Sequence, residues 1–140
     1  MTTDPTLVVT DSADGRSLTG AVHGPADGRP VLFIAGAGTG RAMSFGDDLL
    51  TERGVRLITM DRPGMGGSDP DPARTPTSTA SDYRALVDAV LGLDGATLPV
   101  VANSQGALFG LALAAHGGAS SLVLASPADE VAHPEVRALL

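Results

Sequence analysis

The residues with the clearest chemical potential surround Ser104, where a strand-like apolar run (99–102) gives way to a helical segment (about 106–116). The turn reads Ala102-Asn103-Ser104-Gln105-Gly106. A nucleophilic serine needs small residues two positions before and after it, because the strained strand-to-helix turn leaves no room for larger ones. The Gln105 N–H at the helix start would then face a developing oxyanion. The pattern predicts attack by Ser104 on a carbonyl carbon.

The segments that must position this serine alternate between strand and helix patterns. Two short strands, 6–10 and 17–22, are predicted around the Asp14-Gly15 turn. Apolar runs predict buried strands at 31–34, 55–60, 99–102 and 121–125. Helices are predicted at 43–53, 79–91, 106–116 and from 131 to 140, with a capping box of Thr79 and Asp82 and a loop at 69–78. This alternation predicts an α/β fold with a mostly parallel sheet.

The composition and net charge of the chain exclude several kinds of partner and chemistry. The chain has 140 residues, suited to one domain, and a formal net charge of −7, which argues against nucleic-acid and anionic-membrane partners. It contains no cysteine, which excludes disulfides and a thiolate nucleophile. No segment has the pattern of a signal peptide or a membrane span, so a cytoplasmic protein is expected. No cluster has metal-ligand spacing, and neither a metal nor a cofactor is expected.

Three segments in register resemble the α/β-hydrolase family. The turn around Ser104 is similar to that family's Gly-x-Ser-x-Gly nucleophile elbow, with Ala102 in place of the first glycine. The segment 61–68, Asp-Arg-Pro-Gly-Met-Gly-Gly-Ser, resembles the turn after the family's fourth strand, and 34–38 takes the place of its oxyanion loop. The resemblance implies an oxyanion hole made by the backbone N–H groups of Ala37 and Gln105. Ala35 stands where the family usually has histidine.

Other polar residues receive structural interpretations. Asp61, Arg62 and Ser68 are expected to form a turn-stabilising hydrogen-bond network. His116 is interpreted as the cap at the end of a helix. His23 and His133 are assigned no role.

The resemblance also identifies what this chain lacks. A serine nucleophile needs a histidine base and an acid, which in this family follow the nucleophile in chain order. His133 comes too early to match, and Asp129 and Glu130 are at best a variant acid position. Residues 1–130 are therefore interpreted as the N-terminal part of a hydrolase core, and 131–140 as the start of a cap or a following helix. An apolar edge strand at 121–125 invites pairing, so a C-terminal portion or second chain is expected as partner.

The sequence predicts a serine hydrolase for a small-molecule carbonyl substrate, an ester or else a thioester, a lactone or a C–C bond. A non-catalytic fragment or pseudoenzyme stays open, as does a Ser104 that is only a helix cap. A further alternative is a dinucleotide-binding module, with Gly36 and Gly38 opening a helix and Asp61 about twenty residues later.

Overall fold

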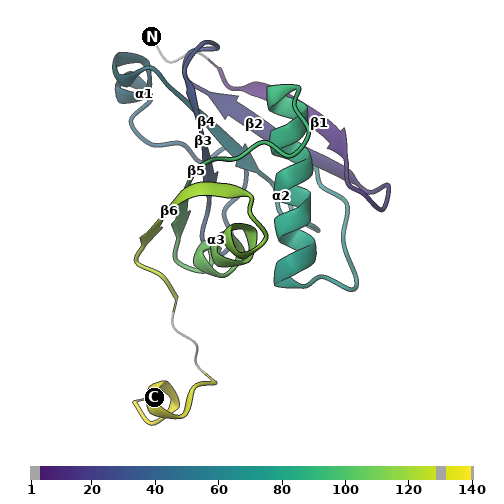
Figure 1. The fold of residues 1–140 in the computed structure, drawn as a ribbon, viewed down its shortest axis with the longest axis vertical. Coiled ribbons are helices and arrows are strands. Elements are labelled where there is room, and N and C mark those ends of the chain that lie inside the picture. The colour runs from purple at the N-terminus through teal and green to yellow at the C-terminus, as the bar shows by residue number, and fades with distance from the viewer. Residues whose placement is uncertain (1–3, 129–131, 140) are drawn as a thin grey trace.

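A single sheet of six strands forms the centre of the molecule (Figure 1). The computed structural model describes residues 4–128 and 132–139. The strands are β1 (Thr6–Asp11), β2 (Ser17–His23), β3 (Arg29–Ile34), β4 (Val55–Met60), β5 (Leu98–Asn103) and β6 (Ala119–Ala125). Their spatial order is β1-β2-β4-β3-β5-β6. β1 and β2 run antiparallel to their neighbours, whereas β4, β3, β5 and β6 are parallel. The predicted mostly parallel α/β sheet is confirmed.

The helices lie on both faces of the sheet. α2 (Pro76–Leu91) and α3 (Gly106–Ala115) pack against each other and cover one face, while α1 (Asp47–Arg53) lies beside β4 on the other (Figure 1). A one-turn helix, α4 (Pro134–Arg137), follows β6. The domain boundary expected at 130–131, with Asp129 and Glu130, falls outside the described residues.

The main core fills the space between the sheet and the pair α2 and α3. The largest side chains under 2% exposed include Tyr83, Leu86, Leu32, Ile34, Ile58 and Leu98. A smaller cluster on the opposite face contains Phe33, Ala35 and Leu57, with Leu50 of α1 packed against it. Apolar runs at β3, β4 and β5 are thus explained by burial on both faces, as expected for central parallel strands.

Helix α1 is shorter than the predicted helix at 43–53. It begins at Asp47, because Gly46 adopts a left-handed backbone with φ of 56°. The Ser44 hydroxyl donates to the Asp47 carboxylate at 2.6 Å. Phe45 lies outside the helix, and its ring meets that of Phe33 edge to face, with 5.0 Å between centroids. Within α1, Leu50 packs against the sheet, whereas Leu49 is 52% exposed.

Helix α2 begins earlier than predicted. It starts at Pro76, and its capping box joins Thr75 and Ser78, not Thr79 and Asp82. The Ser78 N–H donates to Thr75 Oγ1 at 3.0 Å, and the Thr75 N–H donates to Ser78 Oγ at 2.9 Å. The predicted loop at 69–78 is therefore wrong in its last three positions. Proline at the first helical position, where its missing N–H costs nothing, explains the early start.

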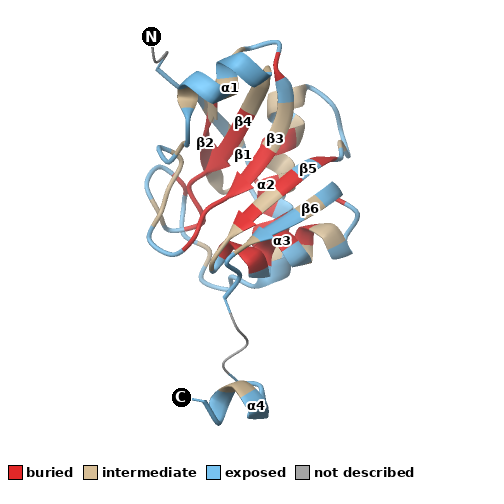
Figure 2. Cartoon of the chain, turned by 90° about the vertical axis from the view of Figure 1, so that its left-hand side faces the viewer, coloured by how far each residue is buried: buried red, intermediate tan, exposed pale blue. Residues whose placement is uncertain are grey.

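Apolar side chains stay exposed at one side of the sheet. β6 is an edge strand, and much of it is exposed (Figure 2). Its Val123 is 57% exposed and is in register with Val101, which packs against the cluster on the α1 face. On α3, Leu108 and Leu111 are each 52% exposed. With Ala112 and Ala115 they are spaced as one helix face, which we call the outer stripe of α3.

Candidate active site

Ser104 occupies the sharp turn between β5 and α3. Its φ is 51°, a left-handed conformation that among the described non-glycine residues only Ser126 shares. Such a backbone costs about 1–3 kcal/mol, and it persists only where the surroundings hold it. The Ser104 N–H donates to the Ala125 carbonyl at 3.1 Å, and its own carbonyl accepts from Ala107 at 3.0 Å and Ala128 at 3.1 Å. The turn is thus fixed by α3 and by the segment after β6.

Small residues flank this turn for a steric reason. A Cβ on Gly106 would lie 2.3 Å from the Ile34 carbonyl oxygen and 2.7 Å from that of Ala35. Any side chain there would push α3 away from the end of β3. Ala102 is fully buried in β5, and a Cβ on Gly110 would already approach its methyl group to 2.8 Å. Close packing of α3 on the sheet therefore requires both small residues.

The loop after β3 lies against Ser104. A Cβ on Gly36 would lie 3.2 Å from Ser104 Cβ, so these two backbones nearly touch. Within residues 4–128 and 132–139, the N–H groups of Ala37 and Gln105 donate to no acceptor, and Ser104 Oγ makes no hydrogen bond. Ala37 and Gln105 are exposed, and Ser104 is partly exposed. Two backbone N–H groups without an acceptor among the described residues therefore lie next to the contact between Gly36 and Ser104, at the carboxyl ends of β3 and β5.

Asp61 is the centre of the expected hydrogen-bond network. It is 2% exposed, and its carboxylate accepts from the Arg41 N–H at 2.7 Å and the Gly67 N–H at 2.9 Å, besides pairing with the Arg41 guanidinium. The Ser68 hydroxyl donates to the Asp61 carbonyl at 2.6 Å and accepts from the Thr19 N–H at 2.9 Å. These bonds connect β2, the loop after β3 and the loop after β4.

Arg62 takes a different part in that network. Its side chain is buried, and the guanidinium donates to the carbonyls of Ala35 and Gly36, the latter at 2.7 Å. It lies 5.1 Å from the centroid of the Phe109 ring of α3. Burial raises the pKa of the nearby Tyr83 phenol to about 12, against a smaller lowering effect of the Arg62 charge. The sequence predicted a polar network here, but not that Arg62 donates hydrogen bonds to the loop beside Ser104.

None of the histidines in the described residues bonds to Ser104. His23 is buried, with Nε2 3.0 Å from the Arg41 carbonyl and 3.2 Å from Thr59 Oγ1. His116 is the C-terminal cap residue of α3, at the opposite end of that helix from Ser104. His133 precedes α4. The described residues hold no group of three or more His, Asp or Glu side chains arranged for a metal, and none of their helices is both long and apolar enough to cross a bilayer.

The dinucleotide-binding alternative is wrong. It required the loop with Gly36 and Gly38 to open directly into a helix, but α1 begins only at Asp47. It also required the Asp61 carboxylate to meet a ribose, and that carboxylate is buried and already bonded to Arg41 and Gly67. A phosphate site at a helix N-terminus does not exist at this loop.

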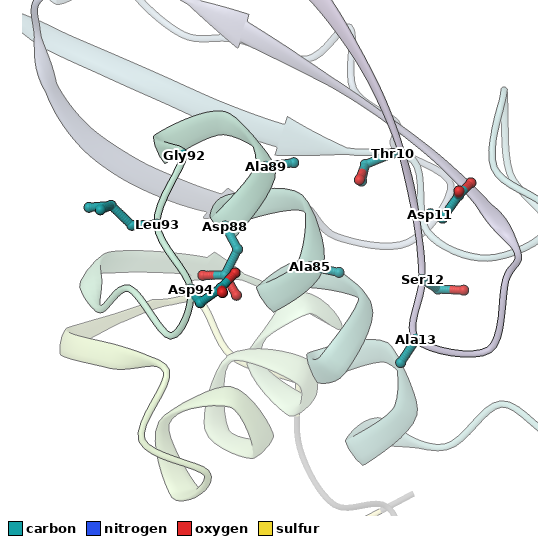
Figure 3. Close-up of a pocket in the computed structure, with 10 residues that line it drawn as sticks. All are labelled: Thr10, Asp11, Ser12, Ala13, Ala85, Asp88, Ala89, Gly92, Leu93 and Asp94. Atoms are coloured by element: carbon teal, nitrogen blue, oxygen red, sulfur yellow. The ribbon is translucent and has the colours of Figure 1, made fainter.

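A separate hollow lies between β1 and the C-terminal part of α2 (Figure 3). Ten residues line it: Thr10, Asp11, Ser12, Ala13, Ala85, Asp88, Ala89, Gly92, Leu93 and Asp94. β1 is the edge strand opposite to β6, so this hollow is remote from Ser104. Asp88 already accepts a hydrogen bond from the Ala96 N–H at 3.1 Å. The hollow contributes nothing to the site.

The strand order, the left-handed serine between β5 and α3 and the glycine loop beside it define a fold of the α/β-hydrolase type. The sequence model described as "Alpha/beta hydrolase family" matches residues 31–140, and the chain belongs to this family.

Solved structures agree with this assignment. An α/β-hydrolase from Sphaerobacter thermophilus is 29% identical, with a TM-score of 0.64 over 84% of this chain and 44% of that one. An epoxide hydrolase from hot-environment metagenomes is 22% identical, with a TM-score of 0.71 over 87% and 42%. An epoxide hydrolase of Vigna radiata is 23% identical, with a TM-score of 0.68 over 86% and 38%. The chain therefore spans less than half the length of each of these three proteins.

Proposed function

We propose that Ser104 is the nucleophile of a hydrolase that acts on carbonyl substrates, with carboxylic esters as the preferred class. The observation that supports this most is the left-handed Ser104, with a hydroxyl free of hydrogen bonds to the described residues and two unused N–H donors, Ala37 and Gln105, beside it. Preorganised donors of this kind stabilise the negative oxygen of a tetrahedral intermediate.

The reaction proceeds in two steps. A histidine base takes the Ser104 proton as Oγ bonds to the carbonyl carbon, and the carbonyl electron pair moves to oxygen, facing Ala37 and Gln105. Collapse of this intermediate breaks the bond to the alcohol, which leaves with the proton. Water then attacks the acyl-enzyme by the same route, releasing the acid and restoring Ser104.

A serine nucleophile favours acyl substrates over epoxides, although two of the similar structures are epoxide hydrolases. Attack by Ser104 Oγ on an epoxide carbon would give an alkyl ether, which water does not cleave under mild conditions. Attack on a carbonyl gives an ester, which the same site hydrolyses. Thioesters, lactones and the C–C bonds of diketones fit the same chemistry as second choices.

The proposal includes a C-terminal portion or second chain that supplies the histidine and the acid. Its support is the outer stripe of α3, the open edge of β6 and the positions of His23 and His116 away from Ser104. Native mass spectrometry of the purified protein tests this part. A complex with a second, different polypeptide, or a longer chain, supports it. A lone, soluble and cooperatively folded chain of this sequence contradicts it.

A fluorophosphonate probe tests the nucleophile in the complete enzyme. We expect the probe to label Ser104, and Ser104→Ala to abolish both labelling and ester turnover while the thermal unfolding temperature is unchanged. Ser126→Ala is the matched control, because Ser126 has the same left-handed backbone at the end of the neighbouring strand. It should keep the label on Ser104. Turnover near the parent rate in Ser104→Ala would show that another group is the nucleophile.

A further inference from the structure

Arg62 is a buried cation whose hydrogen bonds go to backbone carbonyls. Only 2% of the residue is exposed, and within the part of the chain that the structure describes it forms no ion pair with a carboxylate. Its two terminal nitrogens donate instead to the carbonyls of Ala35 and Gly36. Burying a charge is costly unless it is well hydrogen-bonded, so such a residue calls for an explanation beyond filling space.

The bond to Gly36 fixes the direction of the next amide. No peptide bond in the described residues is cis, so the carbonyl of Gly36 and the N–H of Ala37 belong to one planar trans unit and point in opposite directions. Since the carbonyl points at Arg62 Nη2, 2.7 Å away, the Ala37 N–H must point away from Arg62. A second hydrogen bond, from Arg62 to the Ala35 carbonyl, holds the loop at two points and so restrains its rotation.

The surroundings give this contact electrostatic strength. The Arg62 guanidinium lies over the Phe109 ring, 5.1 Å from its centroid, and near the buried Tyr83. A cation at the carbonyl end of an amide in such a low-dielectric setting polarises it, which makes its N–H a stronger donor. Ala35 offers no side-chain hydrogen bond of its own to hold the loop.

We propose that Arg62 is the positioning residue of the oxyanion hole: it orients and polarises the Gly36–Ala37 amide from behind, without touching the substrate. This inference rests on the proposed function of Ser104. Because the Ala37 N–H meets a charged oxygen only in the transition state, loss of Arg62 should lower kcat and leave KM nearly unchanged.

Kinetics of the complete enzyme on an ester test this role. Arg62→Gln should lower kcat by about 10-fold to 100-fold, while KM changes by less than about 2-fold. This fall in kcat should not exceed the fall caused by removing a direct oxyanion donor. Affinity for a trifluoromethyl ketone, which forms a tetrahedral adduct on serine, should fall by the same factor as kcat. Affinity for the carboxylic acid product should be unchanged.

Arg16→Gln is the matched control for general destabilisation. Arg16 is also mostly buried, but it pairs with Asp14 and Asp82 near β1, at the other side of the sheet. It should lower the unfolding temperature without changing kcat at temperatures where the protein is folded. If Arg62→Gln does not fold, Arg62→Lys replaces it, because lysine keeps the charge but lacks the fork that holds two carbonyls.

The outcomes separate this inference from the function on which it rests. A parent enzyme that neither turns over esters nor labels at Ser104 overturns the proposed function. A parent that does both, with a folded Arg62 variant of unchanged kcat and unchanged trifluoromethyl ketone affinity, overturns the role of Arg62 alone. A fall in kcat and ketone affinity together, with KM and product affinity steady, supports it.

Discussion

Tyr83 is the residue whose burial has the most direct measurable result. It is the single tyrosine in a chain without tryptophan, and 1% of it is exposed. Burial raises its pKa to about 12 from 10.0, because the phenolate is poorly solvated inside the core. Its near-ultraviolet titration therefore reports on one known site.

We predict that stability falls between pH 10 and pH 12 because of Tyr83. In that range the unfolded chain loses the phenol proton while the folded protein keeps it, so rising pH favours unfolding. Two pKa units correspond to about 3 kcal/mol, lost in full only above pH 12. Denaturant unfolding at several pH values measures this slope.

Tyr83→Phe provides the control. Its stability should decline less over the same range, since phenylalanine has no proton to lose. A tyrosine absorbance change centred near pH 10 in the folded protein would contradict the predicted burial effect.

At single positions the sequence predicted the strand-to-helix turn at Ser104 well, because steric rules relate Ser104 to its neighbours in the chain. Ala102 and Gly106 follow from those rules, and the structure adds the reason, the close approach of α3 to β3. The partners of Arg62 could not be predicted. They are backbone carbonyls at the end of another strand. Every residue has a backbone carbonyl, so the residue types in the sequence do not show which one accepts a hydrogen bond.

Thr79, in the N-terminal part of α2, is a position where a substitution should increase stability. Thr79 is fully buried, and within the described residues its hydroxyl has no hydrogen-bond partner. A buried hydroxyl without a partner costs free energy, whereas valine has nearly the same shape and no polar atom. Thr79→Val should therefore raise the free energy of unfolding by about 1 kcal/mol, measured by urea denaturation.

The same experiment distinguishes the two capping assignments. If Thr79 began the helix, Thr79→Val would lower stability by about 1 kcal/mol. Thr75→Ala should give that loss instead, because Thr75 Oγ1 accepts from the Ser78 N–H. Losses in both variants would contradict the start of α2 at Pro76.

Elements with strong periodicity were predicted correctly, and their ends less so. The continuous apolar runs of β3, β4 and β5 predicted buried strands without any further information. The start of α1 depended on the φ of Gly46 and on Phe45 leaving the helix to meet Phe33. Both are tertiary effects, which local pattern does not contain.

For the whole molecule, exposed apolar surface predicts association. The outer stripe of α3 and the edge of β6 together present Leu108, Leu111 and Val123 to solvent. A single chain of this sequence should therefore self-associate as its concentration rises. Leu111→Lys should shift it toward monomer in analytical ultracentrifugation.

Leu93→Lys is the matched control for this surface. Leu93 is 62% exposed in the turn after α2, and the substitution changes the charge equally without altering the outer stripe. It should leave the association constant nearly unchanged. If Leu111→Lys and Leu93→Lys changed the association constant equally, the change would be due to net charge and not to the outer stripe.

The strand order also governs how the molecule assembles in time. β5 pairs with β3, from which it is separated in the chain by three elements, α1, β4 and α2, and Gly106 packs against carbonyls at the end of β3. Contacts so distant in the chain carry a high loop-closure entropy and form slowly. During synthesis the loop around Ala37 emerges first; its contacts with Arg62 become possible next, and its contact with Ser104 only after β5 has been made. The arrangement around Ser104 is thus the product of a late, long-range folding event, while the β1–β2 hairpin forms early from local contacts.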